Sequence, residues 1–285
     1  MKNEKTVCAK NKCTGCMACV EMCSQNAISI IDTTQNYNAV IDSQKCISCG
    51  ICTRVCQNNS ILALQRPRSW YQGWIDDEML RRESSSGGAA KAIAQQFIRD
   101  GGVVISCCFS SGKFCFRAVE DIEKLNCFTG SKYVKSNPSG VYKKIRELLR
   151  QSRKVLFIGL PCQVGAVKTV FGESERLYTV DLICHGTPSP KVLTDYLASR
   201  KVALNEVDNI SFRYKDIFGL AKDKVPLSQP GSCDNYLLAF LCGLDYTDNC
   251  YECKYAGIAR VSDITLGDSW KSDLPEKEQR QGISL

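Results

Sequence analysis

The chain has 285 residues, a formal net charge of +7, and 44% hydrophobic and 24% charged residues. These values are ordinary for a folded globular protein and exclude a low-complexity or fibrous chain. No apolar run approaches the roughly 20 residues of a membrane-spanning helix, and the N-terminal segment MKNEKTVCAKNK lacks the apolar stretch of a secretory signal. We therefore expect a cytoplasmic protein with no membrane span.

Nineteen cysteines are many for a chain without a secretory signal. Disulfides are rare in the reducing cytosol, where thiols stay available as metal ligands. The cysteine content therefore predicts metal binding rather than a disulfide framework. The excess of positive charge favours an acidic redox partner or a phosphate-bearing cofactor rather than nucleic acid, although a solvated surface with extra lysines would give the same value.

The N-terminal region contains two copies of one cysteine pattern, C-x2-C-x2-C-x3-C, at 13–23 and 46–56, which lie 33 residues apart. Eight thiolates at this spacing are typical of two 4Fe–4S clusters in a ferredoxin-type domain, in which the fourth ligand of each cluster comes from the other copy. The alternative is a pair of zinc sites, because C-x2-C pairs also bind zinc. The predicted ligands are Cys13, Cys16, Cys19 and Cys56 for one cluster, and Cys46, Cys49, Cys52 and Cys23 for the other.

The residues around this pattern fit the same interpretation. The apolar runs 27–31 and 60–64 are predicted to be short strands. Gly15 and Gly50 allow the backbone to turn close to the sulfur atoms. Ser24 and Gln57 stand where ferredoxins usually have a proline after the fourth cysteine. Because so short a segment has little core of its own, bound clusters are expected to hold it together.

After a linker at 65–68, strand-like and helix-like segments alternate. Helices are predicted from their end signals and periodicity, and strands from short apolar runs. The predicted strands are 103–109, 114–119, 155–158, 177–183 and 210–214, and the predicted helices are 89–99, one opened by Asn137-Pro138, 164–171, 190–199 and 234–244. Such alternation is typical of an α/β domain with a mostly parallel or mixed sheet.

The fold class predicted for the whole chain is therefore an α+β ferredoxin-like two-cluster domain followed by an α/β domain. The expected domains are 1–66 and 67–285, the second with an N-terminal part at about 67–160 and a C-terminal part at about 161–285. The last residues, Gly282-Ile283-Ser284-Leu285, look like the start of a further strand. We therefore expect a chain that is truncated at its C-terminus.

Four of the other cysteines could form a third site. Cys162 and Cys184 each follow a predicted strand, where ligands gather in α/β sheets, and Cys250 and Cys253 form a C-x2-C pair. The alternative is burial as small hydrophobic residues. The remaining cysteines are predicted to be packing or surface thiols, and they are Cys8, Cys107, Cys108, Cys115, Cys127, Cys233 and Cys242.

His185 is the single histidine of the chain and lies in a Gly-Pro loop. It could contact a cofactor or move a proton, or it could be a hydrogen-bonded loop residue. A run of basic residues from Lys132 to Lys154 could dock an acidic partner or form a solvated helix face. No catalytic residue is predicted.

Seven segments after the linker are distinctive, and they are 85–88, 130–136, 156–163, 180–190, 212–215, 250–256 and 260–268. Taken together, they resemble the coenzyme F420 hydrogenase/dehydrogenase beta-subunit family. The resemblance implies an iron–sulfur flavoprotein oxidoreductase with FAD and a third 4Fe–4S cluster. It would pass electrons from a two-electron carrier, of the deazaflavin type or similar, to a redox partner such as a ferredoxin or an oxidoreductase subunit. The alternative is an electron-transfer subunit that has clusters only.

The resemblance also implies roles for particular residues. Cys162, Cys184, Cys250 and Cys253 become ligands of the third cluster, and Ser86, Gly87 and Gly88 offer backbone N–H groups to the flavin diphosphate at a helix N-terminus. Lys132, Tyr133 and His185 would line the cofactor site. Ser269 and Lys271 depart from the family, which tends to have an aromatic residue and a glycine there, and the chain has no G-x-G-x-x-G motif.

Overall fold

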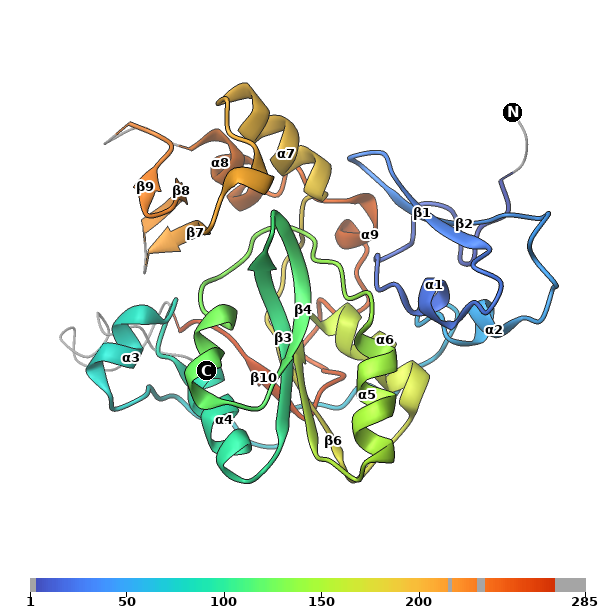
Figure 1. The fold of residues 1–285 in the computed structure, drawn as a ribbon, viewed down its shortest axis with the longest axis horizontal. Helices are drawn as coiled ribbons and strands as arrows, with labels where there is room; N and C mark the ends of the chain where they lie inside the picture. Colours follow the sequence, from blue (N-terminus) through green and yellow to red (C-terminus); the bar gives the residue numbers. More distant parts are fainter. Residues whose placement is uncertain (1–3, 215–216, 230–233, 270–285) are drawn as a thin grey trace.

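The computed structural model describes residues 4–214, 217–229 and 234–269. These residues form a two-stranded, a five-stranded and a three-stranded sheet. Figure 1 shows the N-terminal region beside the part of the central sheet that carries α5 and α6, and the three-stranded sheet lies with α7 and α8 in another part of the molecule. Within the described ranges, no helix has the length and apolar character needed to cross a membrane.

The ladder region, by which we mean residues 4–64, contains four short elements. They are α1 (Ala18–Met22), β1 (Ile28–Asp32), β2 (Tyr37–Ile41) and α2 (Ile51–Arg54). The strands pair antiparallel, with Ile28 opposite Ile41. The prediction of a strand at 60–64 is wrong, since the second strand of this sheet is β2. Leu62 and Leu64 instead pack directly on the main core, and the backbone joins only a single bridge, at Gln65.

The two cysteine copies have the same backbone conformation. Left-handed residues occur at Gly15 and Met17 in the first copy, with φ of 71° and 62°. They recur 33 residues later at Ser48 and Gly50, with φ of 56° and 71°. Each copy thus places glycine at only one of its two left-handed positions, and α1 and α2 each begin directly after the second one.

The central sheet has the strand order β10-β6-β5-β3-β4. The first four strands of this order are parallel, and β4 is antiparallel to β3. This confirms the predicted mixed, mostly parallel sheet. The strands are β3 (Val103–Ser110), β4 (Lys113–Val119), β5 (Val155–Gly159), β6 (Leu177–Leu182) and β10 (Ile264–Leu266).

Helices cover both faces of this sheet, which explains why its strands are apolar runs. On one face, α5 (Val141–Arg150) and α6 (Pro161–Phe171) pack on Val103 and Phe157. On the other face, α4 (Ala89–Arg99) and the 3-10 helix η1 (Ile122–Phe128) pack on Val104 and Leu156. Cys16 and Ala18 of the ladder belong to the same core as α5 and α6, so the ladder region is packed against that face.

The three-stranded sheet is a separate unit. Its strands are β7 (Ile210–Tyr214), β8 (Ile217–Lys222) and β9 (Val225–Pro226). Phe212 packs with α7 (Pro190–Ser199) and α8 (Asn235–Leu241) in a third core. The predicted strand 210–214 therefore forms, but it joins this sheet rather than the central one. The remaining elements are α3 (Glu78–Glu83), the 3-10 helix η2 (Leu204–Glu206) and α9 (Asp248–Tyr251).

Most predicted elements after the linker are confirmed, and α4 and α7 have the predicted ends. α6 begins at Pro161 rather than at 164, because proline fits the first turn of a helix, and Cys162 therefore lies in that turn. α8 ends at Leu241, three residues before the predicted end. Cys233, Lys271 and the segment 282–285 lie outside the described residues.

Candidate functional site

The first ladder site is a small cavity between the two cysteine copies. Cys13, Cys16 and Cys19 of the first copy line it together with Cys56 of the second copy. All four are buried. The second ladder site is a small cavity lined by Cys46, Cys49, Cys52 and Cys23.

Each cavity therefore takes three cysteines from one copy and the last cysteine from the other. This is the arrangement that the spacing predicts, although ligation itself stays a prediction. In the described part of the chain, no three Cys, His, Asp or Glu side chains converge tightly enough to hold a single metal ion. A 4Fe–4S core, with four irons and four sulfides, needs a wider ring of thiols than one ion does.

Backbone amides donate hydrogen bonds to cysteine sulfurs in both ladder sites. Gly15 N–H donates to Cys13 Sγ over 3.5 Å, and Ser48 N–H donates to Cys46 Sγ over 3.4 Å, at equivalent positions of the two copies. Ala27 N–H donates to Cys23 Sγ over 3.4 Å. Such donors stabilise ligating thiolates and influence the reduction potential of a cluster. The thiol set and these amides fit a 4Fe–4S cluster in each site.

Cys8 also lines the first cavity, which the sequence did not indicate. It is buried, and the adjacent Cys13 thiol raises the pKa of Cys8 to about 11. The Asn58 amide donates to its sulfur over 3.9 Å. The first site thus has five thiols around it. No spacing rule could have found the fifth, because Cys8 precedes the ladder motif.

Gln57 connects the first ladder site to the α/β domain. This residue, which replaces the usual proline, is fully buried. Its side-chain carbonyl accepts a hydrogen bond of 2.6 Å from the Tyr255 hydroxyl, and its amide donates to the Thr14 hydroxyl over 3.2 Å. The Lys254 ammonium donates to its backbone carbonyl. The departure from the ferredoxin pattern therefore has a structural reason, since a proline could make none of the side-chain bonds.

The third cysteine set consists of Cys162, Cys184, Cys250 and Cys253, and the structure brings all four together from separate segments. Cys162 lies in the first turn of α6, Cys184 lies two residues after β6, and the other two lie in and just after α9. Burial raises the pKa of Cys162 well above its ordinary value, and the other three thiols raise it further. Burial raises the pKa of Cys184 to about 11.

Polar side chains surround Cys250. The Asn249 amide donates to its sulfur over 3.6 Å, and the hydroxyls of Thr247 and Thr187 lie 3.5 and 4.0 Å from it. Thr247 and Thr187 are buried. Donors of this kind stabilise a thiolate, so the set fits a cluster ligand at this position.

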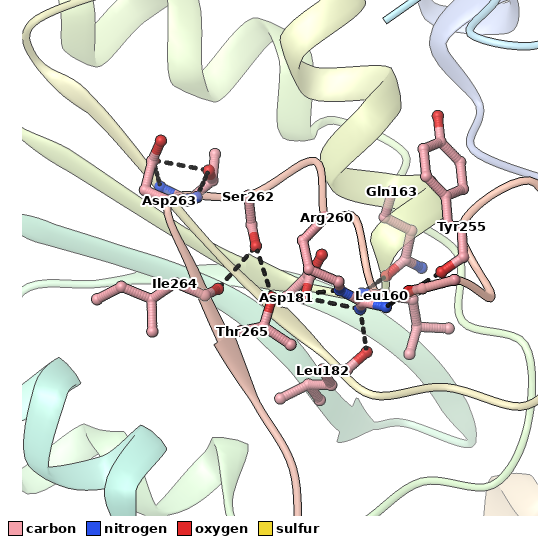
Figure 2. A network of polar contacts seen from close by, with 12 residues as sticks. Leu160, Gln163, Asp181, Leu182, Tyr255, Arg260, Ser262, Asp263, Ile264 and Thr265 are labelled. Carbon is pink, nitrogen blue, oxygen red and sulfur yellow. Dashed lines mark hydrogen bonds and ion pairs between the residues drawn. The ribbon is translucent and has the colours of Figure 1, made fainter. Parts of the chain in front are cut away.

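Arg260 fixes the loop that follows Cys253 onto the central sheet (Figure 2). Its guanidinium donates to Asp181 over 2.9 Å and to the Leu182 carbonyl over 3.4 Å, both at the end of β6. It also donates to the Tyr255 carbonyl over 3.1 Å. One buried ion pair thereby holds the C-x2-C segment beside the strand end that leads to Cys184.

The residues predicted to bind the flavin diphosphate lie at the N-terminus of α4. Gly88 is left-handed, with φ of 85°, and directly precedes this eleven-residue helix. Gly87 and Gly88 are buried. Adding a Cβ to Gly88 would place it 2.8 Å from Ile75, so the position requires glycine.

Lys132 and Tyr133 are engaged within the chain. The Lys132 ammonium donates to the carbonyls of Phe128, Thr129 and Gly130 over 2.8 to 3.0 Å. Burial lowers the pKa of Lys132. The Tyr133 ring stacks on Phe240, with 4.4 Å between centroids. These contacts show how both side chains are positioned.

Arg213 joins several of the segments that carried the family resemblance, a role that the sequence analysis did not assign. Its guanidinium forms an ion pair of 2.6 Å with Asp268 and donates to the Tyr133 hydroxyl over 3.0 Å. It also donates to the Ser85 carbonyl over 2.8 Å. The signal was present in the sequence, because Arg213 and Asp268 both lie in matching segments.

His185 makes its polar contact with Tyr246. The Tyr246 hydroxyl donates to the Phe240 carbonyl over 2.6 Å, so His185 Nδ1 donates to the hydroxyl oxygen. Burial lowers the pKa of His185. The neutral ring then has Nε2 as an acceptor, and the ring lies against Phe240, which in turn stacks on Tyr133.

Comparison with known families agrees with this arrangement. Residues 12–60 match the family model of the 4Fe–4S dicluster domain, and residues 152–285 match that of the C terminus of the coenzyme F420 hydrogenase/dehydrogenase beta subunit. The fold and the matches define an iron–sulfur electron-transfer protein. The second match confirms the resemblance of the C-terminal part to the coenzyme F420 hydrogenase/dehydrogenase beta-subunit family.

A solved structure supports the fold. A chain of the F420-reducing [NiFe] hydrogenase complex from Methanosarcina barkeri is similar, with a TM-score of 0.52 and 18% sequence identity. The similarity covers 79% of this chain and 76% of that chain. No functionally curated protein matches the sequence of this chain.

Proposed function

We propose that this chain is an iron–sulfur flavoprotein oxidoreductase subunit with three 4Fe–4S clusters and FAD. It would exchange electrons between a two-electron carrier, of the deazaflavin type or similar, and a redox partner protein. The observation that supports this most strongly is the third cysteine set. Four thiols from three separate segments meet beside the ladder region, in a chain whose C-terminal part matches the beta-subunit family model.

The three thiol sets form a row. Tyr255 lies close to Cys162 and Cys253 of the third set and also to Cys16 and Cys56 of the first ladder site. Cys19 of the first site lies close to Cys52 of the second site. The order is therefore third set, first site, second site. Short separations favour electron transfer, because its rate falls steeply with distance.

Clusters supply one-electron transfer when they are bound, and a flavin couples it to two-electron chemistry. The residues of this chain would hold and tune them. The thiols would ligate, the backbone amides of Gly15, Ala27 and Ser48 donate to sulfur in the ladder sites, and the side-chain amide of Asn249 donates to Cys250. Cys49 in the second site is exposed, so this end of the row faces solvent and a partner could reach it.

The FAD part of the proposal uses Ser86, Gly87 and Gly88 as donors to the diphosphate, with Lys132, Tyr133 and His185 nearby. The left-handed Gly88 before α4 supports it, since N–H groups at a helix N-terminus bind anions. A second candidate function is a subunit with clusters and no flavin. The Lys132 contacts favour that candidate, because its ammonium already donates to three backbone carbonyls.

Anaerobic purification followed by iron, sulfide and flavin analysis tests the proposal. Three clusters give about twelve irons per chain, and the proposed flavoprotein also releases FAD on acid treatment. About twelve irons without flavin would favour the second candidate. About eight irons and no flavin would contradict the third cluster. A colourless protein that contains zinc would overturn both candidates.

A further inference from the structure

Lys135 is buried, although it belongs to the basic run that suggested a docking or solvated surface. Only 4% of its surface is exposed. Its backbone N–H donates to the Pro188 carbonyl over 2.9 Å, in the loop that follows Cys184. This bond holds the residue against the segment that supplies one thiol of the third set.

The Lys135 side chain lies between the ladder region and the third cysteine set. A Cβ on Gly15 would lie 3.2 Å from Lys135 Cδ, so the aliphatic part packs on the first cysteine copy. The ammonium lies over the Tyr37 ring of β2, 5.4 Å from its centroid. On the other side, the positive charge of Lys135 reaches the thiols of Cys162, Cys184 and Cys253. Burial raises the pKa of each thiol, and the lysine charge acts to lower it.

Among the residues that the structure describes, no carboxylate lies within ion-pair distance of the Lys135 ammonium. A buried charge is costly unless an opposite charge lies close to it. The thiols of the third set lie near Lys135 and can become negative. Asp32 also lies in this neighbourhood, where its carboxylate accepts hydrogen bonds from the Tyr37 and Ser189 hydroxyls. A cubane held by four thiolates is an anion, and reduction adds one more negative charge to it.

We propose that Lys135 is the charge-compensating residue of the third cysteine set and raises the reduction potential of the cluster held there. This inference rests on the proposed third cluster. In a reductive titration one electron passes from dithionite to the cluster, which gains one negative charge. Because the ammonium attracts the extra negative charge, it favours the reduced form.

The test is an EPR-monitored redox titration of the anaerobically purified chain, the Lys135→Met variant and the Lys135→Arg variant. The signal of the third cluster is assigned by its loss in the Cys250→Ser, Cys253→Ser double variant. We expect Lys135→Met to lower the equilibrium constant for reduction at least about tenfold, which is about 59 mV for one electron. Lys135→Arg retains the charge and should remain within about threefold of the unsubstituted chain, roughly half that shift.

The control is Lys191→Met, which removes the same charge from an exposed lysine paired with Asp195. Solvent screens this position, so the potential of the third cluster should not change. If Lys135→Met loses the third cluster while Lys135→Arg keeps it, charge compensation is supported; loss in both would show a packing role and overturn the inference. If Lys135→Met keeps about twelve irons and its third cluster has an unchanged potential, the role of Lys135 is overturned but the proposed function is not. About eight irons in the unsubstituted chain would contradict the proposed function as well.

Discussion

The ladder region and the third cysteine set use the same ligand type but are held in place differently. Cysteines are half of the buried residues in the ladder's own small core, which consists of Val7, Cys8, Cys13, Cys19, Ile28, Ala39, Ile41 and Cys56. The third set instead lies at the end of a five-stranded sheet that has a core on each face, and neither the α4 side nor the α5–α6 side depends mainly on cysteines. Clusters should therefore stabilise the ladder region itself, whereas the α/β domain should position its cysteines before a cluster is bound.

The largest expected effect is that of Cys56→Ser. We expect the loss of about four irons and partial unfolding of the ladder region, because its core contains few other apolar side chains. Iron analysis and hydrogen exchange would measure both. Cys8→Ser is the matched control, since it changes another buried thiol of the same cavity and should keep all the iron. Iron loss in Cys8→Ser, together with full iron in Cys56→Ser, would show that Cys8 rather than Cys56 is the ligand.

The double variant Cys250→Ser, Cys253→Ser tests whether the α/β domain keeps its fold without a cluster at the third cysteine set. It should also lose about four irons, but the chain should keep its fold and its ladder clusters, because the sheet does not depend on this set. Circular dichroism and the EPR signals of the ladder clusters would show this. Cys242→Ser is the control, as Cys242 is exposed at the end of α8. Unchanged iron in the double variant would contradict the ligand assignment.

Arg260→Met should weaken the scaffold of the third set without touching a thiol. Asp181 is fully buried, and removing one partner of a buried ion pair costs about 3–5 kcal/mol. We expect the free energy of unfolding in urea to fall by about that amount and the third cluster to be lost faster than the ladder clusters. Lys168→Met removes an ion pair with the exposed Asp263 and should cost less than about 1 kcal/mol. Equal costs would refute a special role for Arg260.

The same contrast explains what the sequence could predict. The ladder cysteines lie within two short motifs, so their spacing alone predicts which four line each cavity. The ends of α4 and α7 were predictable because each helix has local residues that mark its start and end. The strand predicted at 60–64 was wrong because its apolar alternation is real but faces the main core rather than a partner strand. Short apolar runs do not specify which surface they pack on.

The third set was less predictable because it depends on contacts between distant residues. Strand ends and the C-x2-C spacing suggested that Cys162, Cys184, Cys250 and Cys253 form one site, but burial as small hydrophobic residues stayed an alternative until the family resemblance favoured the site. The position of Cys250 and Cys253 depends on Arg260 meeting Asp181, 79 residues earlier in the chain. Lys135 likewise looked like one basic residue among several, since no local pattern shows that the ladder region and the loop at Pro188 bury it.

The smallest effect is expected where the two regions meet. Tyr255→Phe removes the 2.6 Å hydrogen bond to Gln57 and leaves a buried carbonyl without that donor, which costs about 1–2 kcal/mol. Iron content should not change, but amides near Gln57 should exchange faster, because the bond fixes the ladder region on the α/β domain. Tyr251→Phe is the control. The Tyr251 side chain is exposed, and its hydroxyl donates to the Gly243 carbonyl. If both variants gave the same exchange rates, Gln57 and Tyr255 would not connect the two regions energetically.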